Sequence, residues 1–316
     1  MNNLLKKYVG IIIGAVYALI LRLVFNIHAL NEAFSLFSVT FIWITPIIIG
    51  VIPLFYADKD QIKRWGYRIF SPVWTVIVFF VFCFLSRIED LICLWVITIP
   101  YMLGAVTVGI VAGEIIQRVR AKRGTLYSII LLPLILSPIE QQFKKPTNSY
   151  SVVTKVIVDA SVGTIWNNII RVRQIDKNEY TKGFFNYAGI PRPLYAELDK
   201  DTLGATRIGH FEGGLKFIEK VKIWNRNKHI SFDITVVPSS IRETVFDQHI
   251  LRGSHFRFLN AAYDLKPLSN GQTELTLSSS YELTTNINSY ASYYGNQLLT
   301  DFQERLLEVI KSRCEN

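Results

Sequence analysis

Long apolar runs in the first half of the chain constrain the fold more than any other feature of the sequence. A helix needs roughly 20 apolar residues to cross the ~30 Å hydrocarbon core of a bilayer. Four runs reach or approach that length, so we predict that residues 1–143 form a multi-pass transmembrane region. The runs cover residues 8–27, 34–57, 70–86 and 91–113.

A fifth apolar segment, 126–139, decides the expected topology. It is shorter than the others and is interrupted by Pro133 and Pro138. Leaving it in water would expose an apolar patch, and this favours a fifth span. With five spans the C-terminal half lies outside the cytoplasm, and with four it lies inside.

The basic residues of the first half indicate its orientation, since Lys and Arg mark cytoplasmic loops. Basic clusters at 6–7, 59–68 and 118–123 alternate with weakly charged connections at 28–32 and 87–90. We therefore expect an integral protein of the cytoplasmic (inner) membrane, with its N-terminus inside and its C-terminal domain outside the cytoplasm.

The net charge of +9 follows this division of the chain. Residues 1–149 contain 14 Lys and Arg against 7 Asp and Glu, and residues 150–316 contain 20 against 18. The excess charge therefore belongs to the apolar half and marks its loops. A nucleic-acid partner would require basic residues on a folded polar surface, so we exclude this class.

Two charged residues lie close to the apolar runs. Arg22 is about one helical turn from the end of its run, and we expect its side chain to snorkel to the interface. Glu114 lies at a helix end beside the basic loop. Neither position favours a transport pathway, so the first half is interpreted as an anchor.

The composition changes at residues 144–150, which we interpret as a linker, and residues 151–316 form the second domain. Apolar residues there alternate at the period of strands, and the chain ends in an amphipathic helix. Residues 182–206 favour loops or short helical pieces because of their Gly and Pro content. We predict a strand at 151–158, a helix at 162–171, about five antiparallel strands at 206–211, 215–224, 229–237, 257–265 and 273–283, and a helix from 288 onward.

Two charged residues are predicted on inward faces of this sheet. Alternation places Glu219 with Leu215, Phe217, Val221 and Ile223, and it places Arg257 with Leu259 and Tyr263. A buried charge without a partner is costly. Glu219 and Arg257 therefore either pair across the sheet or fix the polar head of a ligand.

The order of elements resembles the helix-grip fold of the SRPBCC superfamily, which includes START lipid-transfer domains and polyketide cyclases. The resemblance rests on Val152–Ala160 with Ile165 and Trp166, on Gly209–Val221, on Phe256–Leu265 and on Tyr290–Arg313. It covers about residues 150–316. The expected fold class is thus an α-helical transmembrane region followed by an α+β helix-grip domain, in which a curved antiparallel sheet wraps a long C-terminal helix.

What the resemblance implies is a cavity between that helix and the sheet for an apolar or amphipathic small molecule. We expect binding of a lipid-like ligand, for transport or sensing, next to the bilayer. The alternative reading of the aromatic residues is that they fill a solid core. The predicted ligand-binding residues are Phe217, Glu219, Phe232, Arg257, Tyr263, Tyr281, Tyr290 and Tyr294.

Two other functions stay open. One is a cavity enzyme of cyclase, dehydratase or hydrolase type, for which no catalytic residue can be named. The other is a membrane sensor or assembly protein that binds a protein partner. We expect no cofactor and no metal, because the three cysteines and five histidines show no ligand spacing. His210, His249 and His255 follow no catalytic motif, and the oligomeric state is not predicted.

Overall fold

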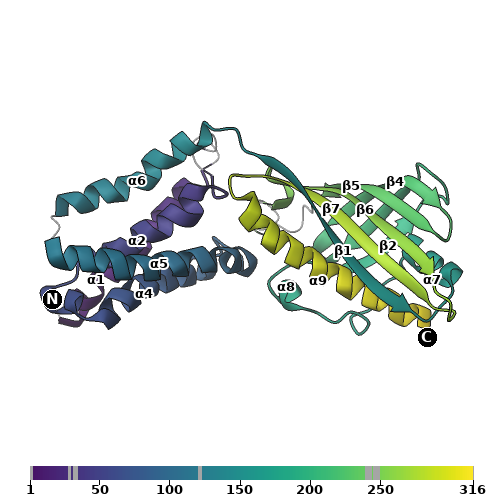
Figure 1. Ribbon diagram of the computed structural model, residues 1–316, viewed down its shortest axis with the longest axis horizontal. Coiled ribbons are helices and arrows are strands. Elements are labelled where there is room, and N and C mark those ends of the chain that lie inside the picture. The colour runs from purple at the N-terminus through teal and green to yellow at the C-terminus, as the bar shows by residue number, and fades with distance from the viewer. Residues whose placement is uncertain are drawn as a thin grey trace. The chain divides into compact units, whose positions relative to one another are not determined.

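The structure is a computed structural model that describes residues 3–27, 30, 35–119, 123–238, 244 and 250–315 (Figure 1). The chain divides into two compact units, which are described separately. A helical unit comprises Met1–Pro146 and the short connector Thr285–Ile287, and a sheet unit comprises Thr147–Thr284 and Asn288–Asn316. Several residues used in the sequence arguments lie outside the described ranges: His28, Glu32, Arg120, Lys122 and His249.

Each of the five predicted apolar segments is largely helical in the helical unit. The segment containing Pro133 and Pro138 forms one continuous helix, and the second segment begins with a π-helical turn. The elements are α1 (Asn3–Val24), the π-helical turn (Thr40–Ile44), α2 (Thr45–Phe55), α3 (Lys59–Lys63), α4 (Trp65–Leu85), α5 (Leu91–Val119) and α6 (Arg123–Gln141).

Glycines allow close contacts between these helices. Gly10 and Gly14 of α1 face α2, and a Cβ atom on Gly10 would lie 2.7 Å from the Cα atom of Pro53. Gly109 and Gly113 of α5 face Arg68 of α4, and a Cβ on Gly113 would lie 2.9 Å from the Arg68 Cδ atom. Both pairs have the G-x-x-x-G spacing that brings helix backbones together in membranes.

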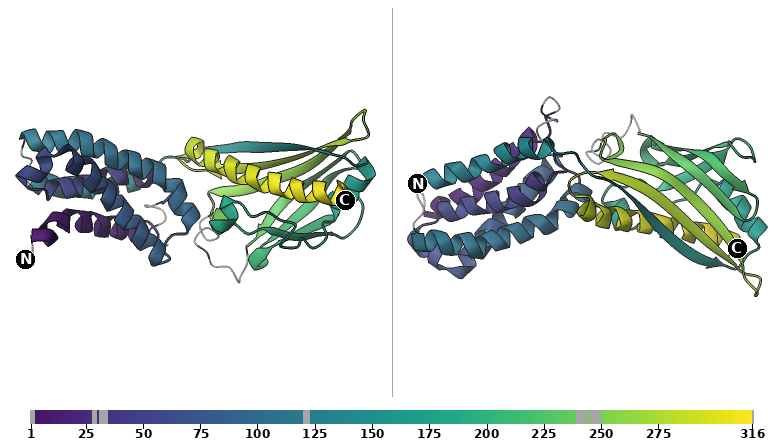
Figure 2. Two further views of the ribbon diagram at one scale, coloured as in Figure 1. Left: turned by 90° about the horizontal axis from the view of Figure 1, so that it is seen from below. Right: turned by 45° about the horizontal axis from the view of Figure 1, so that its top comes forward.

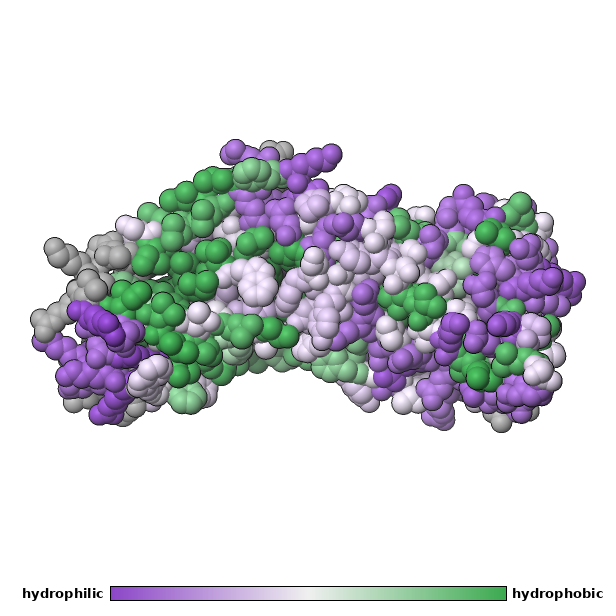
Figure 3. Space-filling view, viewed as in Figure 1, coloured by the Kyte–Doolittle hydropathy of each residue, from purple (hydrophilic) through white to green (hydrophobic). Residues whose placement is uncertain are grey.

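The surface of the helical unit is apolar. Along α1, the side chains of Ile12, Val16 and Ile20 recur every four residues and are each about half exposed. On the face drawn in Figure 3, hydrophobic side chains cover much of this unit, whereas the sheet unit is mostly hydrophilic. Two helices, Trp65–Leu85 and Leu91–Arg118, are long and apolar enough to cross a membrane, and the other apolar helices are shorter.

The prediction for Arg22 is wrong. Its side chain is 1% exposed, forms an ion pair with Glu89, and donates from Nη2 to the carbonyl of Ile88 at 3.2 Å. Glu89 lies in the connection between α4 and α5 and is itself buried. The carboxylate of Glu89 therefore compensates the charge of Arg22 inside the helical unit, so this side chain does not need to extend to solvent. Glu114 does lie near the end of α5, where it accepts from Arg68 and Arg118 at 2.7 Å each.

The sheet unit is a seven-stranded antiparallel sheet wrapped against a long helix, and this confirms the predicted helix-grip fold class (Figure 2). The strand order is β1-β7-β6-β5-β4-β3-β2, so β1 and β2 form the two edges. Helix α9 packs on β1 and β7, and the short α7 packs beside it. The elements are β1 (Thr147–Val158), α7 (Val162–Ile170), α8 (Phe184–Tyr187), β2 (Pro193–Leu198), β3 (Thr206–Phe211), β4 (Lys216–Asn225), β5 (His229–Val237), β6 (Phe256–Pro267), β7 (Thr273–Thr284) and α9 (Asn288–Glu315).

Two boundaries differ from the sequence prediction. Strand β1 begins at Thr147, within the segment interpreted as a linker. Strand β2 lies where loops or short helices were expected. The prediction missed this strand because Pro191 and Pro193 interrupt the alternation of its sequence. An edge strand tolerates proline, since one side of its backbone needs no ladder partner. A tight turn joins β3 and β4, with Gly213 and Gly214 at φ 70° and 81°.

Candidate functional site

The inner face of the sheet has a closed end and an accessible end. At the closed end, Trp166 of α7 contacts Trp224 edge to face, with ring centroids 5.2 Å apart, inside a core that includes Ile310 of α9. At the other end, inward-facing aromatic side chains are packed on one another but mostly only partly buried. The partial exposure of these rings makes this second end the candidate site.

Five phenylalanines form the accessible end, and we call them the aromatic row. Phe211, Phe217, Phe256 and Phe258 come from the sheet, and Phe302 comes from α9. Consecutive ring centroids lie 4.6 Å (Phe211 to Phe217), 5.0 Å (Phe217 to Phe258) and 4.8 Å (Phe258 to Phe256) apart, and Phe302 lies 6.0 Å from Phe211. Four of the five are partly exposed, and Phe211 is buried. Such a row offers a continuous apolar wall.

The neighbouring strand extends this wall. Val236 pairs with Phe217 and Ile234 pairs with Glu219, so both aliphatic side chains share the inner face. Both are partly exposed. Removing apolar surface from water lowers the free energy of the system. The wall therefore favours an apolar occupant.

A buried ion pair marks the boundary between the two ends. Arg207 of β3 and Glu219 of β4 are directly opposite each other in the strand pairing. Arg207 Nη1 donates a hydrogen bond to Glu219 Oε2. Arg207 also donates from Nε to the carbonyl of Ile170 and from Nη2 to that of Ile169, both at 3.2 Å. These carbonyls end α7, where the helix dipole favours a cation.

Two of the predicted ligand-binding residues, Phe232 and Tyr263, contact this ion pair and do not lie at the accessible end. The guanidinium of Arg207 lies 5.3 Å from the ring centroid of Phe232, which is fully buried. The hydroxyl of Tyr263 is hydrogen-bonded to Arg207, and burial raises the pKa of Tyr263 to about 12. Phe232 and Tyr263 therefore belong to the closed core, whereas Phe217 lies in the aromatic row.

The three other predicted tyrosines lie around the N-terminal part of α9. Tyr281 is fully buried and donates to Ser292 O at 3.1 Å or Asn296 Oδ1 at 2.7 Å. Gly295 makes room for it, because a Cβ there would lie 2.8 Å from the Tyr281 hydroxyl. Tyr290 and Tyr294 share a hydrogen bond of 3.1 Å on α9, and burial raises the pKa of Tyr290.

The predicted inward placement of Arg257 is wrong, as is that of Ile223. Arg257 is 68% exposed and forms an ion pair with Glu282 at 2.9 Å. The register shifts between Phe258 and Asn260 in β6, and a similar shift occurs after Val221 in β4. Each bulge adds one residue to the strand and reverses which face the alternation predicts. Glu219 is inward as predicted, but its partner is Arg207.

Arg207 and Gly209 are two residues that the sequence pattern did not single out. The alternation of β3 places Arg207, Gly209 and Phe211 on one face, so the signal was present. Gln303 was missed as well. It is fully buried in α9, accepts from Thr154 at 2.7 Å and donates to Ser279 Oγ at 2.9 Å, and so attaches the helix to β1 and β7.

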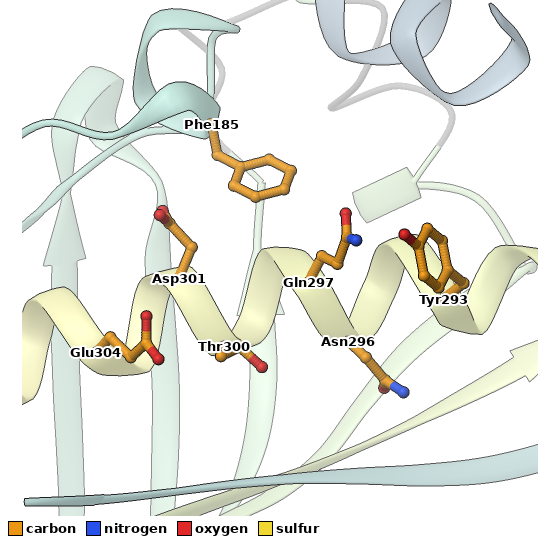
Figure 4. A pocket seen from close by; sticks show the side chains of 7 residues that line it. All are labelled: Phe185, Tyr293, Asn296, Gln297, Thr300, Asp301 and Glu304. Carbon is orange, nitrogen blue, oxygen red and sulfur yellow. The ribbon is translucent and has the colours of Figure 1, made fainter. Parts of the chain in front are cut away.

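A hollow of about 440 Å³ runs along the flank of α9 that faces α8 (Figure 4). Phe185 of α8 lies over the helix, and Gln297 and Asp301 point toward its side. Asp301 forms an ion pair with Arg305, and Arg305 also donates a hydrogen bond to the Thr181 carbonyl at 2.7 Å. This hollow is open and polar on one side, so it is a weaker candidate than the aromatic row.

Neither His210 nor His255 is part of the aromatic row or of the hollow. His210 stacks on Tyr195 with ring centroids 4.2 Å apart, and His255 Nδ1 lies 3.3 Å from the Thr284 carbonyl. Across the described ranges, no group of three or more His, Cys, Asp or Glu side chains is placed to hold a metal ion.

Comparisons with known proteins give structural likenesses only. No family model and no curated protein matches the chain. Among solved structures, a START superfamily protein from Mycobacterium smegmatis aligns at 14% identity and a TM-score of 0.36, over 52% of this chain and 97% of its own. A truncated norcoclaurine synthase from Thalictrum flavum aligns at 11% identity and a TM-score of 0.33, over 54% and 96%. A protein from Nitrosospira multiformis aligns at 14% identity and a TM-score of 0.33, over 52% and 96%.

Proposed function

We propose that this chain is a membrane-anchored protein whose sheet unit binds an apolar or amphipathic small molecule at the aromatic row. The observation that carries the proposal is the partial exposure of Phe217, Phe256, Phe258 and Phe302 on the inner face of a curved sheet. Phe302, Phe256 and Phe258 pack against buried core residues on one side and keep part of their surface exposed on the other. The Arg207–Glu219 pair closes the space behind them, so the ligand enters from the accessible end.

Membrane anchoring is the second part of the proposal. It is supported by the exposed apolar stripe of α1, by the G-x-x-x-G contacts and by the two helices of spanning length. We propose five spans with the N-terminus in the cytoplasm. An apolar ligand partitions into the bilayer, so a tethered pocket meets it at a high effective concentration.

The enzyme alternative receives less support from the described residues. Arg207, Glu219 and Tyr263 do converge, but Arg207 and Tyr263 are buried, and the donors of Arg207 are used by Glu219 and by the carbonyls of Ile169 and Ile170. A general acid or base must reach the proton that it transfers. We therefore propose binding, without an assigned reaction.

The test compares two neighbouring residues of β4 in the full chain, reconstituted in phosphatidylcholine nanodiscs. Phe217 faces the aromatic row, and Ile218 lies on the outer face with its side chain 37% exposed. A diazirine-bearing hydrocarbon is expected to label peptides of β4, β6 and α9. Phe217→Ala should weaken its binding about tenfold, because one ring contact is worth about 1.4 kcal/mol.

Ile218→Ala is the matched control and should leave the binding of the probe unchanged. Equal effects of the two substitutions, or labelling confined to the apolar helices, would contradict a ligand site on the inner face.

A further inference from the structure

One end of the helical unit gathers cationic side chains. Helix α3 and the residue after it present Lys59, Lys63 and Arg64, which are all exposed, and we call these three residues the cationic corner. Within the part of the chain that the structure describes, none of the three forms an ion pair. Figure 3, viewed as Figure 1, shows hydrophilic side chains collected at the end of this unit where the chain begins. Exposed cations without a countercharge attract an anionic partner.

The described carboxylates at this end do not neutralise the corner. Asp58 accepts a backbone N–H of α3 at 2.9 Å and so caps this helix. Glu114 of α5 accepts from Arg68 and Arg118 at 2.7 Å each, so its charge is already shared by two other cations. Asp60 is exposed to solvent. Together with Arg68 and Arg118, the corner places five cations beside these three carboxylates, and this end keeps a net positive charge.

Buried contacts fix the corner to the helical unit. Arg68 of α4 is buried, and its Nε atom donates to the carbonyl of Ile62 in α3 at 2.5 Å. Its guanidinium lies 5.6 Å from the ring centroid of Trp65, and its Nη1 atom donates to Glu114. Helix α3 also packs on α4 and α5. The cations are therefore presented from a defined position, and not from a free loop.

An aromatic surface begins directly after the corner. Trp65 follows Arg64 in the chain, and Trp65, Phe70 and Trp74 of α4 are each more than half exposed. Exposed tryptophans next to Lys and Arg are typical of the level at which lipid headgroups meet hydrocarbon. A molecule with an anionic head and apolar tails fits this order, because its head can contact the corner while its tails contact α4.

We propose, on the basis of the membrane anchoring proposed above, that the cationic corner binds the phosphate of an anionic phospholipid of the surrounding bilayer. Lys59, Lys63 and Arg64 hold the phosphate, and the acyl chains lie against the exposed rings of α4. A zwitterionic headgroup is disfavoured, because it brings a cation of its own to a surface that already carries excess positive charge.

The experiment measures lipid binding to the detergent-solubilised full chain by native mass spectrometry. The two probes are dioleoyl-phosphatidylglycerol and dioleoyl-phosphatidylcholine, which share their acyl chains and differ in headgroup charge. One Lys or Arg near an anionic surface is worth about fivefold in affinity, or about 1 kcal/mol. We therefore expect the first phosphatidylglycerol to bind at least about tenfold more tightly than phosphatidylcholine, and we expect salt to reduce this preference.

Substitutions assign the preference to the corner. The triple variant Lys59→Gln, Lys63→Gln and Arg64→Gln should bind the two lipids equally, and its exposed positions leave the fold intact. Lys59→Arg combined with Lys63→Arg keeps the charge and should keep the preference.

A matched control removes the same formal charge from the sheet unit. It combines Lys155→Gln, Lys222→Gln and Arg257→Gln, whose side chains are 59%, 55% and 68% exposed. This triple variant should bind phosphatidylglycerol as the unaltered chain does. If it loses the preference as fully as the corner variant, the preference reflects net charge alone and the inference is wrong.

The remaining outcomes separate this inference from the proposed anchoring. The full chain in phosphatidylcholine liposomes should resist extraction by alkaline carbonate. A chain that resists extraction but binds both lipids equally overturns the inference and leaves the anchoring in place. A chain that carbonate releases overturns the anchoring, and the inference fails with it.

Discussion

Replacing Arg207 with methionine is expected to destabilise the sheet unit by about 3–5 kcal/mol. The substitution leaves the carboxylate of Glu219 buried without its partner, and this is the costly way to break a buried ion pair. It also removes the donors to the carbonyls of Ile169 and Ile170 at the end of α7. Hydrogen exchange of β3, β4 and β5 peptides in the full chain measures the loss within this unit alone.

The double variant Arg207→Met with Glu219→Leu should recover most of that stability, because apolar residues of similar volume often replace a buried pair without loss. Arg257→Met is the matched control. Arg257 forms an exposed pair with Glu282, so its removal should cost about 0.5 kcal/mol or less. A larger loss from Arg257→Met than from Arg207→Met would show that the two faces of the sheet are assigned the wrong way round.

The second large effect is expected in the helical unit. Arg22→Leu should destabilise the packing of α1 against the connection that contains Glu89 by about 3–5 kcal/mol, because Glu89 then remains buried and uncompensated. Thermal unfolding of the detergent-solubilised full chain, followed by size-exclusion chromatography of the remaining folded fraction, measures the change.

The control for Arg22 is Arg118, which is 76% exposed and pairs with Glu114 one turn away on α5. Arg118→Leu should change stability by about 0.5 kcal/mol at most. If Arg22→Leu behaves like Arg118→Leu, then the ion pair between Arg22 and Glu89 is not formed in the protein.

Most of the fold could be predicted because apolar residues recur at a different spacing in strands than in helices. The alternation of β5 and β7 and the turn at Gly213 and Gly214 depend on neighbouring residues only, so they are readable without a structure. The long C-terminal helix is local in the same sense. Strand β2 was missed because its stability comes from pairing with β3, which a local pattern does not contain.

The candidate site was less predictable, since it depends on register and on contacts distant in sequence. A single added residue near Leu259 moved Arg257 to the outer face, and no propensity marks that position. Glu219 was correctly placed inward, but its partner Arg207 lies on another strand. Likewise, Arg22 and Glu89 are 67 residues apart, so their pairing appears only in the folded helical unit.

Native mass spectrometry of the full chain, purified in detergent, tests directly whether the sheet unit binds an apolar small molecule. We expect the chain to retain one apolar small molecule, and we expect Phe217→Ala to lower the fraction of chain that carries it whereas Ile218→Ala does not. A chain that emerges without any bound molecule, and whose aromatic row is not labelled by a photoreactive hydrocarbon, would contradict a ligand site on the inner face of the sheet.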